Sequence, residues 1–212
     1  MYEYIREPDA IERQAFDLVR ECTDLAALDD AQAQVALRVV HTSGDPELVD
    51  HLRFSHAAIE VGLQALKARK PILCDVEMVR YGIDETCIDS QVQCHIKAFG
   101  VAEQAAARGE SPSVVAMDYW QDHLEGSIAV IGSAPTALFR LLEMLRLGSP
   151  PPALVIGMPA GFVGAAEAKQ ALWDAAHELG LEVITLLGRQ GGSSTASAAV
   201  NALGHMYRGI YF

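Results

Sequence analysis

Hydrophobic and polar residues alternate with two different rhythms along this chain, and the change falls near residue 70. Before it, apolar residues recur every three or four positions, as they do along one face of an amphipathic helix. We therefore predict three helices in the first third. One follows Pro8, one is capped by Asp29 or Asp30 and ends before Gly44, and one covers 55–68.

Beyond residue 70, short and nearly continuous apolar runs alternate with helical segments. Such runs are typical of parallel strands that helices cover on both faces. The order predicts a three-layer α/β architecture in a single domain over 1–212, with a parallel sheet of about five strands preceded by N-terminal helices. The predicted strands are 71–75, 91–96, 127–131, 153–156 and 182–187, and the helices between and after them are about 135–147, 165–179 and 193–207.

Charge and composition narrow the range of functions. The formal net charge of −12 argues against a general nucleic-acid binder and against a basic membrane contact. No stretch approaches the ~18 apolar residues of a membrane span, and residues 1–8 lack the basic and apolar regions of a signal peptide. The four cysteines form no Cys-x-x-Cys pair, so we expect free thiols and a cytoplasmic protein.

Three predicted strands lead into loops of glycine and small residues that each begin a helix: 132–136, 157–164 and 188–195. Ligands of open parallel sheets bind at the carboxyl ends of the strands, and helix N-termini favour anions. The loops therefore predict a platform for a ligand with several carboxylates or phosphates. The alternative is that the glycines only form tight turns. Binding is favoured for the last loop, where Arg189 and three hydroxyls accompany the glycines, although no loop carries a nucleotide fingerprint.

His41 has two interpretations. It falls in the last turn of the second predicted helix, three residues after Arg38 and on the same face. It can transfer a proton near neutral pH or simply cap the helix, and position alone favours the cap. The other histidines have no zinc-type spacing, so no metal site is predicted. For Asp75 and Glu77 we favour an N-cap and a first-turn charge over a carboxylate pair.

Six segments match a known family in order and spacing. The most specific is Gly157-Met-Pro-Ala-Gly-Phe-Val-Gly-Ala-Ala-Glu167, and the others are 4–6, 38–41, 71–79, 132–139 and 188–193. Together they resemble the precorrin-8X methylmutases along essentially the whole chain. The resemblance implies an isomerase of cobalamin synthesis that shifts the C-11 methyl group of precorrin-8X to C-12, giving hydrogenobyrinic acid or its cobalt form.

The resemblance also implies a flavodoxin-like fold, a homodimer, a corrinoid substrate and no cofactor. The family's catalytic histidine falls on His41, which replaces the cap interpretation. A methyl migration within a conjugated ring needs no nucleophile, metal or redox group, so one histidine that protonates the ring is enough. The implied substrate-binding residues are Arg38, Ser133, Thr136, Met158, Phe162, Arg189, Gly191, Gly192 and Ser193.

The chain departs from the family pattern at several positions. Ser133 replaces the usual Asn, Leu187 replaces a common Arg, and Glu12 and Ala15 replace Tyr and Ser. Residues 110–114 replace a Thr-Arg-Ser-Ala-Ala motif. These differences motivate an alternative hypothesis, a divergent paralogue that binds or hands on a corrinoid without catalysis. A third hypothesis, a binder of an unrelated anion, rests on fold analogy alone.

Overall fold

A mixed sheet of six strands forms the centre of the structure, in the order β1-β6-β5-β4-β2-β3. It is seen in a computed structural model that describes residues 2–212, so Met1 of the predicted 1–212 domain lies outside the described part. Five strands run parallel, and β1 is antiparallel to β6. The strands are β1 (Leu52–Phe54), β2 (Ile72–Cys74), β3 (Val92–Cys94), β4 (Ile128–Ile131), β5 (Leu154–Gly157) and β6 (Val183–Leu186).

The α/β class is confirmed, but the strand count is not, because β1 was not predicted. The five predicted strands are the five parallel ones. β1 has only three residues, Leu-Arg-Phe, which is too short to show a pattern along the chain. It is fixed by pairing at a distance, with Leu52 opposite Leu186 and Phe54 opposite Ile184. An antiparallel edge strand added to a parallel sheet is common in α/β folds.

The parallel strands are apolar throughout because side chains on both faces are buried. In β4, Ile128 and Val130 pack in one core cluster, whereas Ala129 and Ile131 pack in the other. All four side chains are fully buried. Successive residues of a strand point to opposite faces, so a sheet covered on both sides needs an uninterrupted apolar run.

The helices follow the predicted order, with additional short ones. The second is capped by Asp29, whose carboxylate accepts from the N–H of Gln32, and it ends at the left-handed Gly44, as predicted. The helices are α1 (Pro8–Cys22), α2 (Asp30–Ser43), α3 (Ala58–Lys67), α4 (Glu77–Gly82), α5 (Val101–Arg108), α6 (Pro112–Asp118), α7 (Pro135–Arg146), α8 (Ala165–Leu179) and α9 (Ser193–Tyr207), with 3-10 helices η1 (Pro46–His51) and η2 (Glu85–Cys87).

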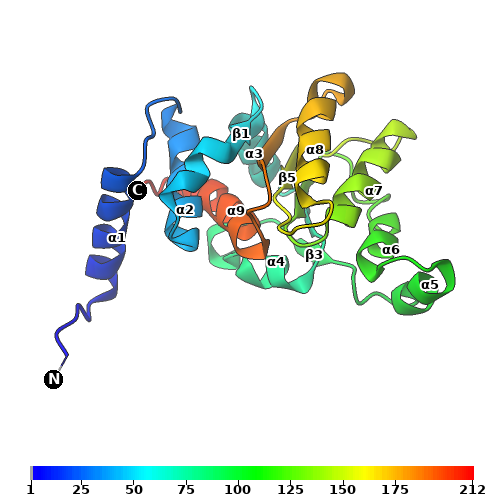
Figure 1. Ribbon diagram of the computed structural model, residues 1–212, viewed down its shortest axis with the longest axis horizontal. Helices are drawn as coiled ribbons and strands as arrows, with labels where there is room; N and C mark the ends of the chain where they lie inside the picture. Colours follow the sequence, from blue (N-terminus) through cyan, green and yellow to red (C-terminus); the bar gives the residue numbers. More distant parts are fainter. Residues whose placement is uncertain (1) are drawn as a thin grey trace.

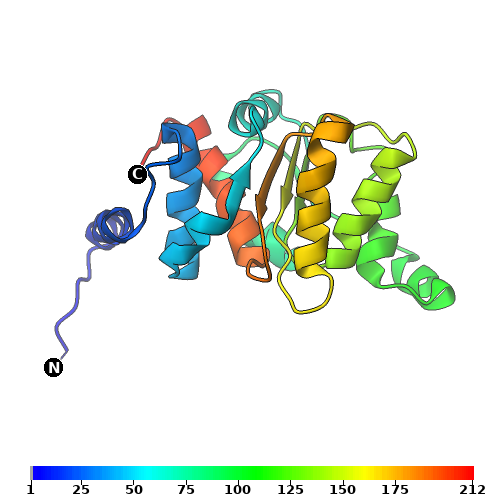
Figure 2. The same ribbon diagram turned by 45° about the horizontal axis from the view of Figure 1, so that its top comes forward.

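The helices lie on both sides of the sheet. α3 and α9 pack with one core cluster, and α7 and α8 pack with the other. α2 packs on α9, and α1 lies at that end of the molecule, opposite α5 and α6 (Figure 1). Figure 2 shows α1 set apart from the body, with the C-terminus close to α2. Among residues 2–212, no helix has the length and apolar character needed to span a membrane.

Candidate functional site

The last two turns of α2 carry Arg38 and His41 on one face. The caps at Asp29 and Gly44 fix where the helix begins and ends, so local sequence sets this placement. The His41 ring stacks on Phe16 of α1, with ring centroids 4.7 Å apart and planes at 17°. The Arg38 guanidinium lies over the same phenyl ring. The predicted proximity of Arg38 and His41 is therefore confirmed.

Arg38 is held in a cage of aromatic and polar groups, and only 13% of its side chain is exposed. Its guanidinium carbon lies 4.4 Å from the ring centroid of Phe212 and 5.0 Å from that of Phe16. Nη1 is 3.6 Å from Glu12 Oε1, and Nη2 donates to Nδ1 of His205. The buried Nε has no hydrogen-bond partner among residues 2–212. The guanidinium is thus held in place by its neighbours, with one buried donor left unpaired.

The surroundings of His41 make its imidazole a weaker base than usual. Partial burial lowers the pKa of His41, and the positive charge of Arg38 lowers it further, whereas the Glu12 carboxylate opposes both. The residue is nevertheless exposed. The ring is therefore neutral near pH 7 and can accept a proton or pass one on.

A cavity of about 710 Å³ opens next to His41, between the end of α2, α4 and the start of α9. Thr42, the residue after His41, lines it with Met78 and Tyr81 of α4. Ser193 of α9 lines it too, and its buried Oγ has no hydrogen-bond partner among residues 2–212. Apolar walls with a few unused polar groups are typical of a small-molecule site.

The start of α9 presents backbone N–H groups that no side chain caps within residues 2–212. Gly191 and Gly192 have φ values of 141° and 125°, which favour glycine. A Cβ on Gly191 would lie 2.4 Å from the carbonyl oxygen of Met158, and the N–H of Gly192 donates to that oxygen at 2.8 Å. The glycines let the loop pack closely while the helix start stays open to an anion.

Arg189 is exposed on the same loop. Its guanidinium lies 5.4 Å from the ring of Phe162, which is itself 87% exposed. Within residues 2–212, no carboxylate forms an ion pair with it. The next residue, Gln190, donates from Nε2 to Asp45 Oδ2 at 3.0 Å. Because Asp45 directly follows the end of α2, the Arg189 loop lies beside the segment that carries His41.

The loop that leads into α7 is not open, and this corrects the predicted platform of three such loops. Asp75, directly after β2, accepts from the backbone N–H groups of Gly132, Ser133 and Ala134 at 3.1, 2.9 and 2.9 Å. Burial raises the pKa of the Asp75 carboxyl, and the backbone donors oppose that shift. The prediction that Asp75 caps the following helix is also wrong, because Val76 is the N-cap of α4 and no side chain within residues 2–212 caps that helix.

Of the predicted site residues within 2–212, Ser193 alone lines the cavity. Ser133 is partly buried and uses its N–H on Asp75. Thr136 is exposed, with its hydroxyl 3.3 Å from Ser111 Oγ. Met158 is fully buried in the core, so its side chain does not line the cavity, although its carbonyl holds the α9 loop.

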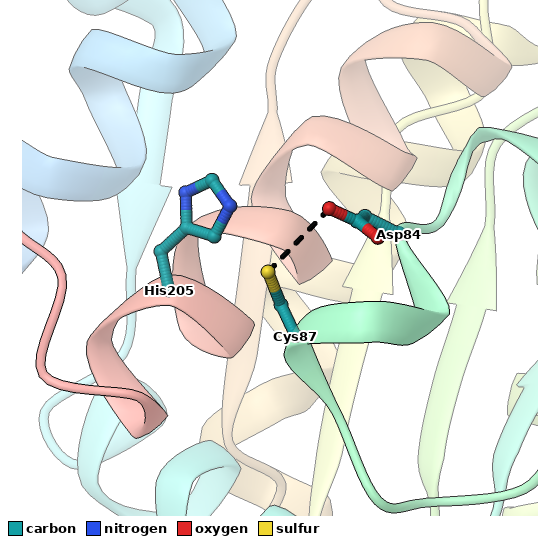
Figure 3. A group of neighbouring side chains, drawn as sticks. All are labelled: Asp84, Cys87 and His205. Atoms are coloured by element: carbon teal, nitrogen blue, oxygen red, sulfur yellow. Dashed lines mark hydrogen bonds between the residues drawn. The ribbon is translucent and has the colours of Figure 1, made fainter.

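A second polar cluster lies next to Arg38, where Asp84, Cys87 and His205 meet (Figure 3). One ligand-type atom from each lies within 4.8 Å of the others, the one such group of three among residues 2–212. Cys87 Sγ donates to Asp84 Oδ2 at 3.4 Å, and burial raises the pKa of the Cys87 thiol. Metal binding needs a thiolate and a free imidazole lone pair. Because His205 Nδ1 accepts from Arg38, the contacts favour a hydrogen-bonded support for Arg38 over a metal site.

Sequence reasoning missed several residues that shape the site. The main chain of Phe212 bonds twice to the Gln34 side chain, at 2.9 and 2.7 Å, which brings the C-terminus to α2. The sequence feature that pointed to this contact is Gln34 itself, a polar residue within the apolar stretch of that helix. Phe16 is one apolar position among several in the helix that follows Pro8, and nothing in the sequence marks its contact with His41. Nothing in the sequence indicated that His205 contacts Arg38.

Comparisons with known proteins show a related family and a related fold. Residues 10–206 match the sequence model of the precorrin-8X methylmutase family. The precorrin-8X methylmutase of Pseudomonas aeruginosa is 46% identical over 205 residues, which cover 96% of this chain and 98% of the relative. The cobalt-precorrin-8 methylmutase of Priestia megaterium is 34% identical, covering 93% and 87%. A solved precorrin-8X methylmutase from Thermus thermophilus aligns with a TM-score of 0.85 at 33% identity, covering 95% and 98%.

Proposed function

Because the chain belongs to the precorrin-8X methylmutase family, we propose that it is an isomerase of cobalamin synthesis that moves the C-11 methyl group of a precorrin-8X-type corrinoid to C-12. The product would be hydrogenobyrinic acid or its cobalt form. The relatives are named as methylmutases for cobalt-free and for cobalt-containing substrates. Their names support the catalytic hypothesis over a non-catalytic paralogue.

The placement of His41 beside the cavity is the observation that carries this proposal. A methyl group can migrate once the macrocycle reaches the tautomer that rearranges, and moving one proton at a ring nitrogen or carbon achieves this. The imidazole of His41 stacks on Phe16, and the residue is exposed. It can therefore hold a proton against a bound ring. A bound polycarboxylate would favour the protonated form of His41, because an opposite charge nearby raises the pKa of a base.

The carboxylates of the substrate have binding groups on either side of the cavity. Arg38 lies one turn before Thr42, which lines the cavity, and its buried Nε has no partner among residues 2–212. The start of α9 offers backbone N–H groups, with the Ser193 hydroxyl and the guanidinium of Arg189 beside them. Guanidinium groups and helix N-termini both suit carboxylates. This local set of donors explains how a chain with a net charge of −12 can bind an anionic ligand.

The site also fits a flavodoxin-type sheet, in which ligands bind where the strand order reverses. Among the parallel strands, the chain moves one way from β2 to β3 and the other way from β4 to β6. The cavity wall α4 follows β2, and a Cβ on Gly132, directly after β4, would lie 2.9 Å from Ser193 Cα. Because the site draws on elements from the whole chain, it supports a single domain over 1–212.

Apolar surface on and before α1 supports the homodimer that the sequence predicts. Ile5, Ile11 and Leu18 are 45%, 47% and 54% exposed and line a shallow groove with Ala15. A second copy of the chain would remove this surface from water. Light scattering at micromolar concentration should give twice the mass of the chain, and a monomer would refute the dimer. The cytoplasmic location stays a prediction.

Incubation of the purified protein with precorrin-8X tests the proposed activity. An isomerase must give a product of unchanged mass, with the absorption spectrum of hydrogenobyrinic acid. Binding of the substrate without such conversion would instead favour the non-catalytic paralogue. Neither binding nor conversion would leave both corrinoid hypotheses without support.

A further inference from the structure

Lys169, in the second turn of α8, is a buried charge that the proposed mechanism does not use. Its side chain is fully buried, and burial lowers the pKa of its ammonium group to about 8. Within residues 2–212 it forms no ion pair with a carboxylate. An unpaired ammonium in the interior is unfavourable for folding, so its presence requires an explanation.

The ammonium of Lys169 donates to the main-chain carbonyl of Gln190, in the middle of the loop that begins α9. The residues on either side are tied to the loop after β5 by backbone bonds. The Gly161 N–H donates to the main-chain carbonyl of Arg189 at 3.0 Å, and the Gly192 N–H donates to the main-chain carbonyl of Met158 at 2.8 Å. The backbone thus holds the two sides of the loop, and Lys169 determines where the carbonyl between them points.

The direction of that carbonyl also decides the direction of the next N–H group. In a planar trans peptide the C=O and the following N–H point in opposite directions. Lys169 draws the Gln190 carbonyl inward, so the N–H of Gly191 must point outward. Among residues 2–212, the Gly191 N–H has no acceptor. Because glycine tolerates both orientations of its preceding peptide, the sequence of the loop alone would not fix this direction.

We propose that Lys169 is a positioning residue that locks the Gln190–Gly191 peptide, so that the Gly191 N–H joins Arg189 and the start of α9 in binding a carboxylate of the ligand. This inference rests on the proposed function for the identity of the ligand. The contact between Lys169 and the loop does not depend on it. The role differs from that of Arg189, because Lys169 is buried and acts through the main chain.

Lys169→Met tests the proposal, since methionine has a similar length and no charge or donor. We expect exchange of the Gly192 amide hydrogen, which bonds to the Met158 carbonyl, to become about tenfold faster when followed by nuclear magnetic resonance. We also expect affinity for hydrogenobyrinic acid to fall about tenfold, and KM to rise with little change in kcat. The melting temperature should be unchanged or higher, because a buried charge has been removed. Lys67→Met, an exposed lysine of α3, is the matched control.

Lys169→Arg, which keeps the charge and the donors, should retain more of the affinity than Lys169→Met. Unchanged amide exchange in Lys169→Met would overturn the proposal, and so would unchanged affinity. A lowered melting temperature with affinity and kcat reduced in proportion would also overturn it, because that result would mean that Lys169 only stabilises the fold. If the wild type did not bind hydrogenobyrinic acid, the proposed function would fail, and amide exchange would still decide whether Lys169 holds the loop.

Discussion

The starts of α7 and α9 look alike in sequence, yet the protein uses them in opposite ways. Each follows a buried parallel strand through a glycine-containing loop, and both lie at the carboxyl ends of the parallel strands. In the loop that leads into α7 the donors are already used, because Asp75 accepts the N–H groups of Gly132, Ser133 and Ala134, although no side chain of residues 2–212 caps the first turn of that helix. At α9 no side chain of residues 2–212 caps the helix, and the Ser193 hydroxyl is unpartnered. A glycine-containing loop before a helix therefore predicts that a negatively charged group accepts from its N–H groups. It does not predict whether that group comes from a ligand or from the chain itself.

The neighbouring strand makes the difference. β2 pairs with β4 so that Cys74 lies opposite Val130, which places Asp75 beside the loop that follows β4. β5 pairs with β6 in the same way, but the residue after β5 is Met158, which supplies only its carbonyl to Gly192. One carboxylate next to an adjacent strand thus forms an internal cap on the loop before α7.

Removal of the internal cap should have the largest effect on stability. Asp75→Ala leaves three backbone donors without their charged acceptor, and each such bond is typically worth ~1.5–3 kcal/mol. We expect the free energy of unfolding to fall by about 3 kcal/mol or more. Chemical denaturation measures this value, with the exposed Asp122→Ala as the control. Near-wild-type stability of Asp75→Ala would mean that the α7 terminus does not depend on its own carboxylate.

The corresponding change at α9 should affect binding and spare stability. Arg189→Ala removes an exposed guanidinium that forms no ion pair within residues 2–212. Loss of a charged hydrogen bond to a carboxylate should weaken binding of hydrogenobyrinic acid roughly ten- to a hundred-fold. Titration of wild type, Arg189→Ala and the distant Arg146→Ala compares the three affinities. Unchanged affinity with a lowered melting temperature would make Arg189 structural.

The unpartnered hydroxyl of Ser193 should have a smaller effect of the same kind. Ser193→Ala removes a polar group that is unsatisfied without ligand, so stability should hold or rise slightly. Affinity for hydrogenobyrinic acid should fall about three- to tenfold, as expected for one neutral hydrogen bond. Ser90→Ala is a matched control. The hydroxyl of Ser90 is also buried and unpartnered within residues 2–212, but this residue precedes β3 and so lies at the amino ends of the parallel strands. Equal affinities in both variants would remove Ser193 from the binding site.

The smallest expected effect concerns the charge balance at His41. The Glu12 carboxylate raises the pKa of His41, against the lowering by burial and by Arg38. Glu12→Gln should therefore lower the pKa of His41 further, so that protonation begins only at a more acidic pH. Nuclear magnetic resonance titration of the His41 ring measures this shift, with Glu21→Gln at an exposed position of α1 as the control. A raised pKa in Glu12→Gln would contradict the assigned charge balance.

Features that depend on neighbours in sequence were predictable, and features that depend on distant contacts were not. Asp29 and Gly44 placed α2 correctly, and with it Arg38 and His41. β1 could not be predicted, because a strand of three residues has no detectable periodicity and its pairing with β6 is long-range. The role of Asp75 was misassigned for the same reason, since its partners lie on another strand's loop. The contacts of Arg38 with His205 and Phe212 also join segments that only folding brings together.

Turnover and affinity measured separately in His41→Ala give the most direct test of the account. Arg38, Ser193 and the start of α9 remain in this variant, so binding of hydrogenobyrinic acid should stay within a few-fold of wild type. Loss of the proton-transferring group should slow conversion of precorrin-8X by roughly a hundred- to ten-thousand-fold, the usual range for general acid–base catalysis. Comparable turnover by the variant and the wild type would contradict the account and remove His41 from the mechanism.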